Sequence, residues 1–203
     1  MTSILKADTI QDTDGNNIIN ENSNTITIGA SGDTISIPSG ATIANSGIAT
    51  GFGGVNTPAF QAYMSSNQVL SNDIETLLQF NTEDFDTAGA YDHSTNYRFT
   101  PQTAGKYFVY AMVLTSGDAN STLLGGGLFV RKNGSKVLES RSNPKNNNGR
   151  AFTNSISIIL DLNGSSDYVD MFGVVDQSGG TPTIEAGTRF SRFGAYKIME
   201  YGK

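Results

Sequence analysis

Residues 99–114 read Phe-Thr-Pro-Gln-Thr-Ala-Gly-Lys-Tyr-Phe-Val-Tyr-Ala-Met-Val-Leu, and this stretch decides the fold class. Pro101 fixes φ and Gly105 permits a positive φ, so the first half predicts a turn between two β-strands. From Lys106 onward the side chains alternate with the period of a strand, and both faces are apolar. One face holds Tyr107, Val109, Ala111 and Val113, and the other Phe108, Tyr110, Met112 and Leu114.

The residues around this stretch extend the same pattern into an all-β domain. Residues 151–162 alternate between an apolar and a polar face, which predicts a strand with one face in the core. Asn133-Gly134 is a strong hairpin signal. Gly125-Gly126-Gly127 inside an apolar strand indicates the close approach of a bulky neighbour or another backbone. The chain has 23 glycines in 203 residues and only 16% charged residues, which favours short strands and tight turns.

Residues 168–175 form a second stretch that is apolar on both faces. A sandwich buries one face of each sheet, so the other face of such a strand needs separate cover. We interpret these strands as parts of a subunit interface, and the alternative is that they are central strands under long loops. The interface candidates are Phe108, Tyr110, Met112, Tyr168 and Phe172.

Residues 1–50 differ from the rest, because all 19 aromatic residues lie at or after Phe52. The pattern x-Thr-Ile recurs at residues 8–10, 24–26, 33–35 and 41–43, with Gly- and Pro-containing turns between the last copies. The burial of ten isoleucines cannot offset the entropy of ordering this segment alone. We therefore expect a slender fibrous stalk in which three identical chains share their Ile stripes, and a disordered polar leader is the alternative. A Gly-rich joint at 51–56 would precede a head at 57–203.

Composition excludes several functional classes. The net charge of -6 opposes nucleic-acid binding through a broad basic face. The absence of cysteine excludes disulfides and thiolate chemistry, and a single histidine, His93, excludes sites that need two imidazoles. No run of 18 apolar residues is present, so we expect no membrane insertion. The first residues lack the apolar stretch of a secretory signal, so we expect no signal-directed export.

Seven motifs, taken in order, resemble the globular head of complement C1q, a relative of the tumour-necrosis-factor jelly rolls. They are residues 58–63 (Pro-Ala-Phe-Gln-Ala-Tyr), 91–92 (Tyr-Asp), 99–108 (quoted above), 130–134 (Val-Arg-Lys-Asn-Gly), 160–162 (Leu-Asp-Leu), 167–169 (Asp-Tyr-Val) and 190–193 (Phe-Ser-Arg-Phe). The resemblance implies a ten-stranded jelly-roll β-sandwich that forms a homotrimer on a trimeric stalk.

The leader resembles those of bacteriophage tail-fibre and appendage proteins, in residues 8–12 (Asp-Thr-Ile-Gln-Asp) and 24–29 (Asn-Thr-Ile-Thr-Ile-Gly). This resemblance implies a virion protein made in the host cytoplasm, with the N-terminal segment attached to other virion proteins. The partners expected are therefore two further copies of the chain, other virion proteins, and a glycan or protein on the host cell surface.

Two loops are candidate binding sites. Glu83, Asp84 and Asp86 supply hard oxygen ligands that suit calcium, and heads of the resembling family often bind calcium; a solvated acidic loop is the alternative. No other cofactor is expected. The amide-rich loop at 142–150 is locally basic, and such groups can hydrogen-bond sugar hydroxyls and acidic glycans. Its candidate ligand-binding residues are Arg141, Asn143, Lys145, Asn147 and Arg150, and a solvated connection without a ligand is the alternative.

These observations favour a non-enzymatic phage fibre protein whose trimeric head binds a host-surface ligand, with a glycan as the expected class. One alternative is a capsid or tail decoration protein with a structural role. Another is a polysaccharide depolymerase, which would need two carboxylates about 5–10 Å apart. Asp161, Asp167, Asp170, Asp176 and Glu185 are available, but their spacing singles out no catalytic pair.

Overall fold

The computed structural model describes residues 9–43, except 12, 14, 16, 24 and 30, and residues 56–199, except 118–120 and 145–146. The chain divides into two units, Met1–Phe52 and Gly53–Lys203, and the division falls at the predicted joint. Residues 51–55 of that joint lie outside the described residues. The described residues contain strands and turns, and none of them belongs to a helix long and apolar enough to cross a membrane.

The N-terminal unit contains a small antiparallel sheet in the order β1-β2-β3. Its strands are β1 (Thr9–Gln11), β2 (Asn17–Asn22) and β3 (Thr25–Ile28). Residues 33–38 and 41–43 contain the last two x-Thr-Ile copies and form no strand, which differs from the expected continuous stack. A strand needs a neighbour for its backbone groups, and the described part of a single chain provides none for these copies.

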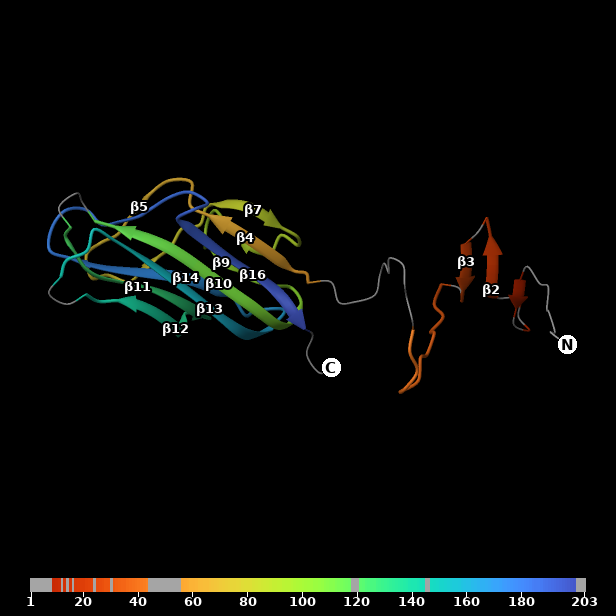
Figure 1. The fold of residues 1–203 in the computed structure, drawn as a ribbon. Coiled ribbons are helices and arrows are strands. Elements are labelled where there is room, and N and C mark those ends of the chain that lie inside the picture. Colours follow the sequence, from red (N-terminus) through yellow and green to blue (C-terminus); the bar gives the residue numbers. More distant parts are fainter. Residues whose placement is uncertain are drawn as a thin grey trace. The chain divides into compact units, whose positions relative to one another are not determined.

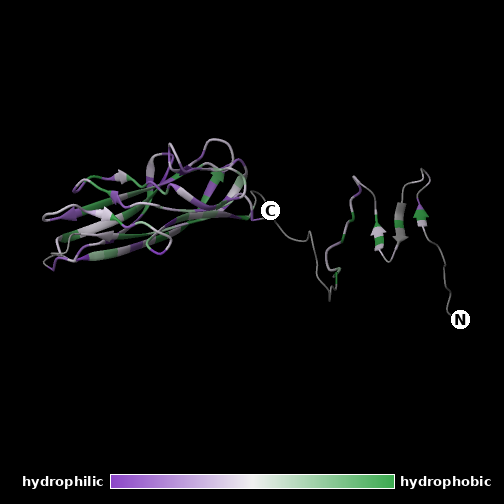
Figure 2. Cartoon of the chain, turned by 90° about the horizontal axis from the view of Figure 1, so that it is seen from above, coloured by the Kyte–Doolittle hydropathy of each residue, from purple (hydrophilic) through white to green (hydrophobic). Residues whose placement is uncertain are grey.

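The isoleucines of this unit whose side chains the structure describes remain in contact with solvent. Ile10, Ile19, Ile26, Ile28, Ile35, Ile37 and Ile43 are each between 37% and 68% exposed. Figure 2 shows hydrophobic colour along these short strands. A single copy of the unit therefore buries little of the apolar surface that its repeat supplies.

The head contains two antiparallel sheets (Figure 1). The first sheet has the order β5-β15-β10-β16-β4-β7, and a seventh strand, β13, pairs with the other edge of β10. Its strands are β4 (Ala59–Tyr63), β5 (Gln68–Val69), β7 (Thr82–Asp86), β10 (Ala104–Ser116), β13 (Ala151–Asn163), β15 (Thr183–Ile184) and β16 (Ser191–Met199). Residues 104–114 of the quoted stretch thus belong to β10, which pairs with β13, β15 and β16 in this sheet.

The second sheet has the order β12-β11-β14-β9-β8, with β6 also paired to β14. Its strands are β6 (Thr76–Leu77), β8 (Tyr91–Asp92), β9 (Arg98–Phe99), β11 (Leu123–Lys132), β12 (Ser135–Ser142) and β14 (Val169–Gln177). Asn133 and Gly134 connect β11 to β12 with φ of 51° and 78°, so the predicted hairpin is confirmed. Most neighbouring strands are distant in sequence, as a sandwich with crossing connections requires.

The core lies between the sheets and takes one face of each long strand. Tyr107, Val109, Ala111 and Val113 point inward from β10, and Ile156, Leu160 and Leu162 from β13. Phe60 stacks on Tyr91 and Phe99, with ring centroids 4.4 Å and 4.7 Å apart. Tyr107 packs edge-on against Phe99, and its hydroxyl donates to the Thr103 carbonyl at 2.7 Å. Burial raises the pKa of Tyr107 to about 12. The predicted alternation of β10 and β13 is confirmed.

Candidate functional site

The outer face of the first sheet carries large apolar side chains that the other described residues leave partly exposed. Phe108, Tyr110 and Met112 of β10 are half-buried on this face. Beside them lie Tyr196 and Ile198 of β16, each 38% exposed, and Ile159 of β13, 57% exposed. The Phe108 ring lies 5.5 Å from that of Tyr196. A contiguous apolar face of this kind is typical of an interaction surface. We call these six residues the first-sheet face.

A chain of hydrogen bonds holds one side of this face in place. The Tyr110 hydroxyl donates to Gln61 Oε1 at 2.8 Å, and Gln61 Nε2 donates to Asp84 Oδ2 at 2.6 Å. Arg192 Nη1 donates to the same Asp84 oxygen at 2.8 Å. Burial raises the pKa of Tyr110. The Tyr110 ring lies against Gly194, where a Cβ atom would come within 2.4 Å of its hydroxyl oxygen.

The same face contains an open hollow of about 420 Å³ next to Tyr110 and Met112. Ser155 and Ser157 of β13 form its far side, and Arg192 its end. The hollow exists because small serines on β13 lie beside large side chains on β10. A projecting side chain of a partner would fit such a depression.

Tyr168 and Phe172 lie elsewhere, on the outer face of the second sheet. Arg98 covers the Tyr168 ring at 4.5 Å, and Arg131 covers the Phe172 ring at 3.7 Å. The five interface candidates are therefore split between the two opposite faces of the sandwich, and only Phe108, Tyr110 and Met112 occur together. The sequence pattern could not separate them, because a strand apolar on both faces looks the same in either sheet.

The outer face of the second sheet is a layer of cations over aromatic rings. Lys136 Nζ lies 3.8 Å from the centre of the Phe129 ring, and the Arg141 guanidinium 5.0 Å from it. Glu75 bridges Arg131 and Lys136, and the hydrogen bond from Lys136 lowers the pKa of Glu75. These stacks explain how an outward-facing Phe129 is fully buried.

Asp170 is buried within this layer. Desolvation raises the pKa of Asp170 to about 6, although the charges of Arg131 and Arg98 act in the opposite direction. Its Oδ1 atom has no hydrogen-bond partner among the described residues. Burial of the charged Asp170 carboxylate therefore lowers the stability of the folded state.

A polar hollow of about 90 Å³ lies at the end of the second sheet, where β11, β12 and β14 meet the loop before β6. Arg141 and Asn143 line it, as do Asp73 and Asp176, with Gly125 and Gly126 below. We call it the glycine hollow. The glycine run is needed here, since a Cβ on Gly125 would lie 3.1 Å from the Ser142 carbonyl oxygen. A Cβ on Gly127 would lie 3.0 Å from Phe129, so the predicted close approach to this run is confirmed.

The structure thus brings together two of the five predicted ligand-binding residues. Asn147 and Arg150 do not line the glycine hollow, and Lys145 lies outside the described residues. Asp73 also lines the hollow but was not predicted as a binding residue, because the sequence around it contains no binding motif. In the sequence, only the Gly125–Gly127 run indicated where the hollow lies. It did not indicate which residues lie opposite the glycines.

The acidic candidates for calcium have separate protein partners. Glu83 Oε1 lies 2.7 Å from His93 Nδ1, and Asp84 Oδ2 accepts hydrogen bonds from Gln61 and Arg192. Asp86 accepts hydrogen bonds from the backbone of Ala88 and Tyr91 at 3.1 Å and 2.8 Å. In the part of the chain that the structure describes, no three His, Asp or Glu side chains converge as metal ligands. The geometry gives the calcium hypothesis no support.

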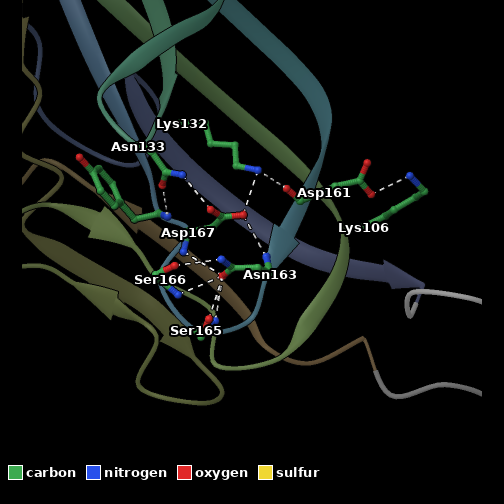
Figure 3. A network of polar contacts seen from close by, with 9 residues as sticks. Lys106, Lys132, Asn133, Asp161, Asn163, Ser165, Ser166 and Asp167 are labelled. Atoms are coloured by element: carbon green, nitrogen blue, oxygen red, sulfur yellow. Dashed lines mark hydrogen bonds and ion pairs between the residues drawn. The ribbon is translucent and has the colours of Figure 1, made fainter.

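Three of the five carboxylates considered for hydrolysis bind other side chains, and Figure 3 shows two of them, Asp161 and Asp167. Asp161 pairs with Lys106 at 2.7 Å, and Asp167 binds Lys132, Asn133 and the Asn163 backbone. Glu185 accepts hydrogen bonds from Ser116 and Asn67. Asp170 and Asp176 are six residues apart on β14, about 20 Å along a strand. That separation is too long for a catalytic carboxylate pair.

Comparison with known proteins supports the fold. No family model matches the chain, and no curated protein matches its sequence. The structure is similar to that of Eiger TNF from S. frugiperda, with a TM-score of 0.54 and 10% identity, over 72% of this chain and 96% of that one. It is also similar to the globular domain of zebrafish complement 1qA, with a TM-score of 0.52 and 15% identity, over 71% and 99%. The head therefore has a C1q/TNF-like jelly-roll fold, as the sequence predicted.

Proposed function

We propose that this chain is a homotrimeric bacteriophage fibre protein whose head binds a glycan on the host cell surface without catalysis. Its N-terminal unit extends or attaches the fibre to other virion proteins, and the assembled protein resides in the virion. The proposal combines the resemblance of the leader to phage appendage proteins with the surface chemistry of the head.

One observation carries the proposal, the exposed apolar surface of the first-sheet face. Ile159, Tyr196 and Ile198 project from two strands beside Phe108 and Tyr110. Covering this face with a second copy removes the apolar side chains from water, and a closed three-fold ring covers it in every copy. The number three comes from the C1q resemblance.

The N-terminal unit supports the same assembly. Its seven described isoleucines are at least 37% exposed, and the last two x-Thr-Ile copies form no strand in a single chain. Identical chains wound together supply both the missing strand neighbours and the cover for the Ile stripe. Three identical weak ligand sites on one assembly would then gain affinity through multivalency.

Two measurements test this proposal. Light scattering of the full chain gives a mass three times the 21.5 kDa of one copy, and a monomer would refute the assembly. Fluorescently labelled full chain binds strains within a panel of bacteria, and periodate oxidation of their surface glycans abolishes the binding. Binding that survives periodate would refute a glycan receptor.

A capsid or tail decoration protein is the second candidate. The apolar first-sheet face and the exposed isoleucines favour self-association in that role as well. Antibody against the head, used to label virions in electron microscopy, separates the two. Label distributed over the capsid would contradict a fibre tip.

A further inference from the structure

We infer that the glycine hollow binds one edge of a neutral sugar residue. The inference rests on the proposed function and narrows it, because it assigns glycan recognition to one site and excludes acidic sugars. The site lies on the second sheet, on the side of the sandwich away from the first-sheet face. The hollow shares no residue with the first-sheet face, so contact at that face does not itself cover it.

The hollow is built from segments that are held firmly. The Asp73 backbone donates to the Val175 carbonyl at 2.7 Å, and Asn72 Oδ1 accepts from the Gln177 backbone at 2.7 Å. These bonds tie the loop of Asp73 to the strand that contains Asp176. Across the hollow, the Arg141 side chain packs over Gly127 and its guanidinium lies on the Phe129 ring. The backbone at Asp73 and Asp176 and the Arg141 guanidinium are thus placed before any ligand arrives.

The chemistry of the lining matches a ring of hydroxyl groups. The carboxylates of Asp73 and Asp176 make no hydrogen bond or ion pair to other described residues, so they are open acceptors for hydroxyl donors. The Arg141 guanidinium can donate to hydroxyl oxygens, and Asn143 forms part of the polar wall. Gly125 and Gly126 have no side chains to keep a ring edge from the backbone, and Val174 offers an apolar wall for C–H groups.

The volume of the glycine hollow and the charges of its lining determine which sugars it can bind. A volume of about 90 Å³ is well below the roughly 300–1,000 Å³ of pockets for drug-sized ligands, so one edge of one sugar residue enters. Two carboxylates face one guanidinium, and Glu139 lies 3.6 Å from Arg141 Nε. This negative balance repels sugars that bear carboxylate or sulfate groups, while the guanidinium repels a bare cation. A neutral sugar satisfies both conditions.

Saturation-transfer NMR on the full-length chain tests the inference. The probes are glucose, galactose, mannose and N-acetylglucosamine, with glucuronic and N-acetylneuraminic acids as acidic counterparts. Signal transfer is expected to at least one neutral sugar and to neither acid. Asp73→Asn and Asp176→Ala should each weaken binding by roughly tenfold or more, because each removes a charged acceptor.

Asp161→Ala is the matched control, since it also removes an exposed carboxylate but lies outside the hollow, where it pairs with Lys106. It should leave sugar binding unchanged. The inference is overturned if no neutral sugar receives signal, if an acid binds more tightly, or if both hollow variants bind as the unmodified chain does. If the chain is a trimer and the hollow variants leave its periodate-sensitive cell binding unchanged, sugar binding at the hollow is refuted. The proposed function then still holds. A monomer without cell binding would refute the proposed function itself.

Discussion

At the scale of single residues, two side chains organise one end of the head. Asn163 Oδ1 accepts hydrogen bonds from the backbone of Ser165, Ser166 and Asp167, each at 3.0 Å. Asp167 in turn binds Asn133 Nδ2 at 2.7 Å and Lys132 Nζ at 2.9 Å. The turn between β13 and β14 is thereby joined to the β11–β12 hairpin, as Figure 3 shows. These bonds lower the pKa of Asp167, with the Asn133 hydrogen bond as the largest cause.

Asp167→Asn should lower the free energy of unfolding by about 1–3 kcal/mol at neutral pH. Because the folded-state pKa is depressed, this stabilisation is fully present above the unfolded pKa of about 3.9 and is lost as the pH falls from there through the lower folded-state pKa. Urea unfolding from pH 7 to pH 3 should therefore show the two proteins converging in acid. The exposed pair of Asp161 with Lys106 provides a control, and Asp161→Asn should change stability by less than about 1 kcal/mol.

Asp170 should produce the opposite pH dependence. Its folded-state pKa of about 6 lies above the unfolded value, so the folded chain holds the proton more tightly. The stabilisation is complete below about pH 4 and is lost as the pH rises through about 6, on the order of 3 kcal/mol in all. Asp170→Asn should remove this decline, which urea unfolding at pH 4, 5, 6 and 7 would measure. Parallel curves for the two proteins would contradict the buried, desolvated state of this carboxyl.

At the scale of elements, the Tyr110 ring of β10 lies across the neighbouring strand β16, where Gly194 leaves room for it. An added Cβ would come within 2.4 Å of the Tyr110 hydroxyl oxygen and 2.9 Å of the Phe60 carbonyl oxygen. The hydroxyl can move, but the carbonyl belongs to a paired strand and cannot move freely. This contact positions the Tyr110–Gln61–Asp84–Arg192 chain on the first-sheet face.

Gly194→Ala should destabilise the head by about 1–3 kcal/mol, as overpacking generally does, and weaken self-association by displacing Tyr110. Thermal unfolding and light scattering measure the two effects. Gly179→Ala is the matched control, since its Cβ would meet nothing within 4 Å, and its stability should change by less than about 0.5 kcal/mol. Equal behaviour of the two variants would show that Gly194 has no role in placing the ring.

Element types were readable from local pattern, whereas sheet membership was not. The alternation of β13 and the Asn133-Gly134 hairpin depend on neighbouring residues alone, so both were predicted. β10 and β14 show the same two-sided apolar pattern, yet they belong to opposite sheets and have different cover. Arginines from β9 and β11 cover the β14 side chains, and the described residues of one chain provide no comparable cover for β10.

At the scale of the whole molecule, the proposed function predicts that the first-sheet face forms the contact between copies. Ile159→Asp places a charge on a side chain that is 57% exposed in one copy and covered in the proposed trimer. The chain should remain folded, because the side chain is outside the core, and its mass should fall toward that of a monomer. Val137→Asp on the second sheet, 40% exposed, is the control and should remain trimeric. A trimer that tolerates Ile159→Asp would place the interface elsewhere.

The sequence by itself determined the all-β character of the head, its turns, the inward face of each long strand and the ring-free N-terminal segment. These features follow from side-chain periodicity and backbone preferences, which act over a few residues. Only the tertiary structure decided which aromatic faces share a surface, and which carboxylates Arg141 and Asn143 meet around the glycine hollow. Those contacts join strands far apart in the chain, and their partners depend on sheet order, which local periodicity does not encode.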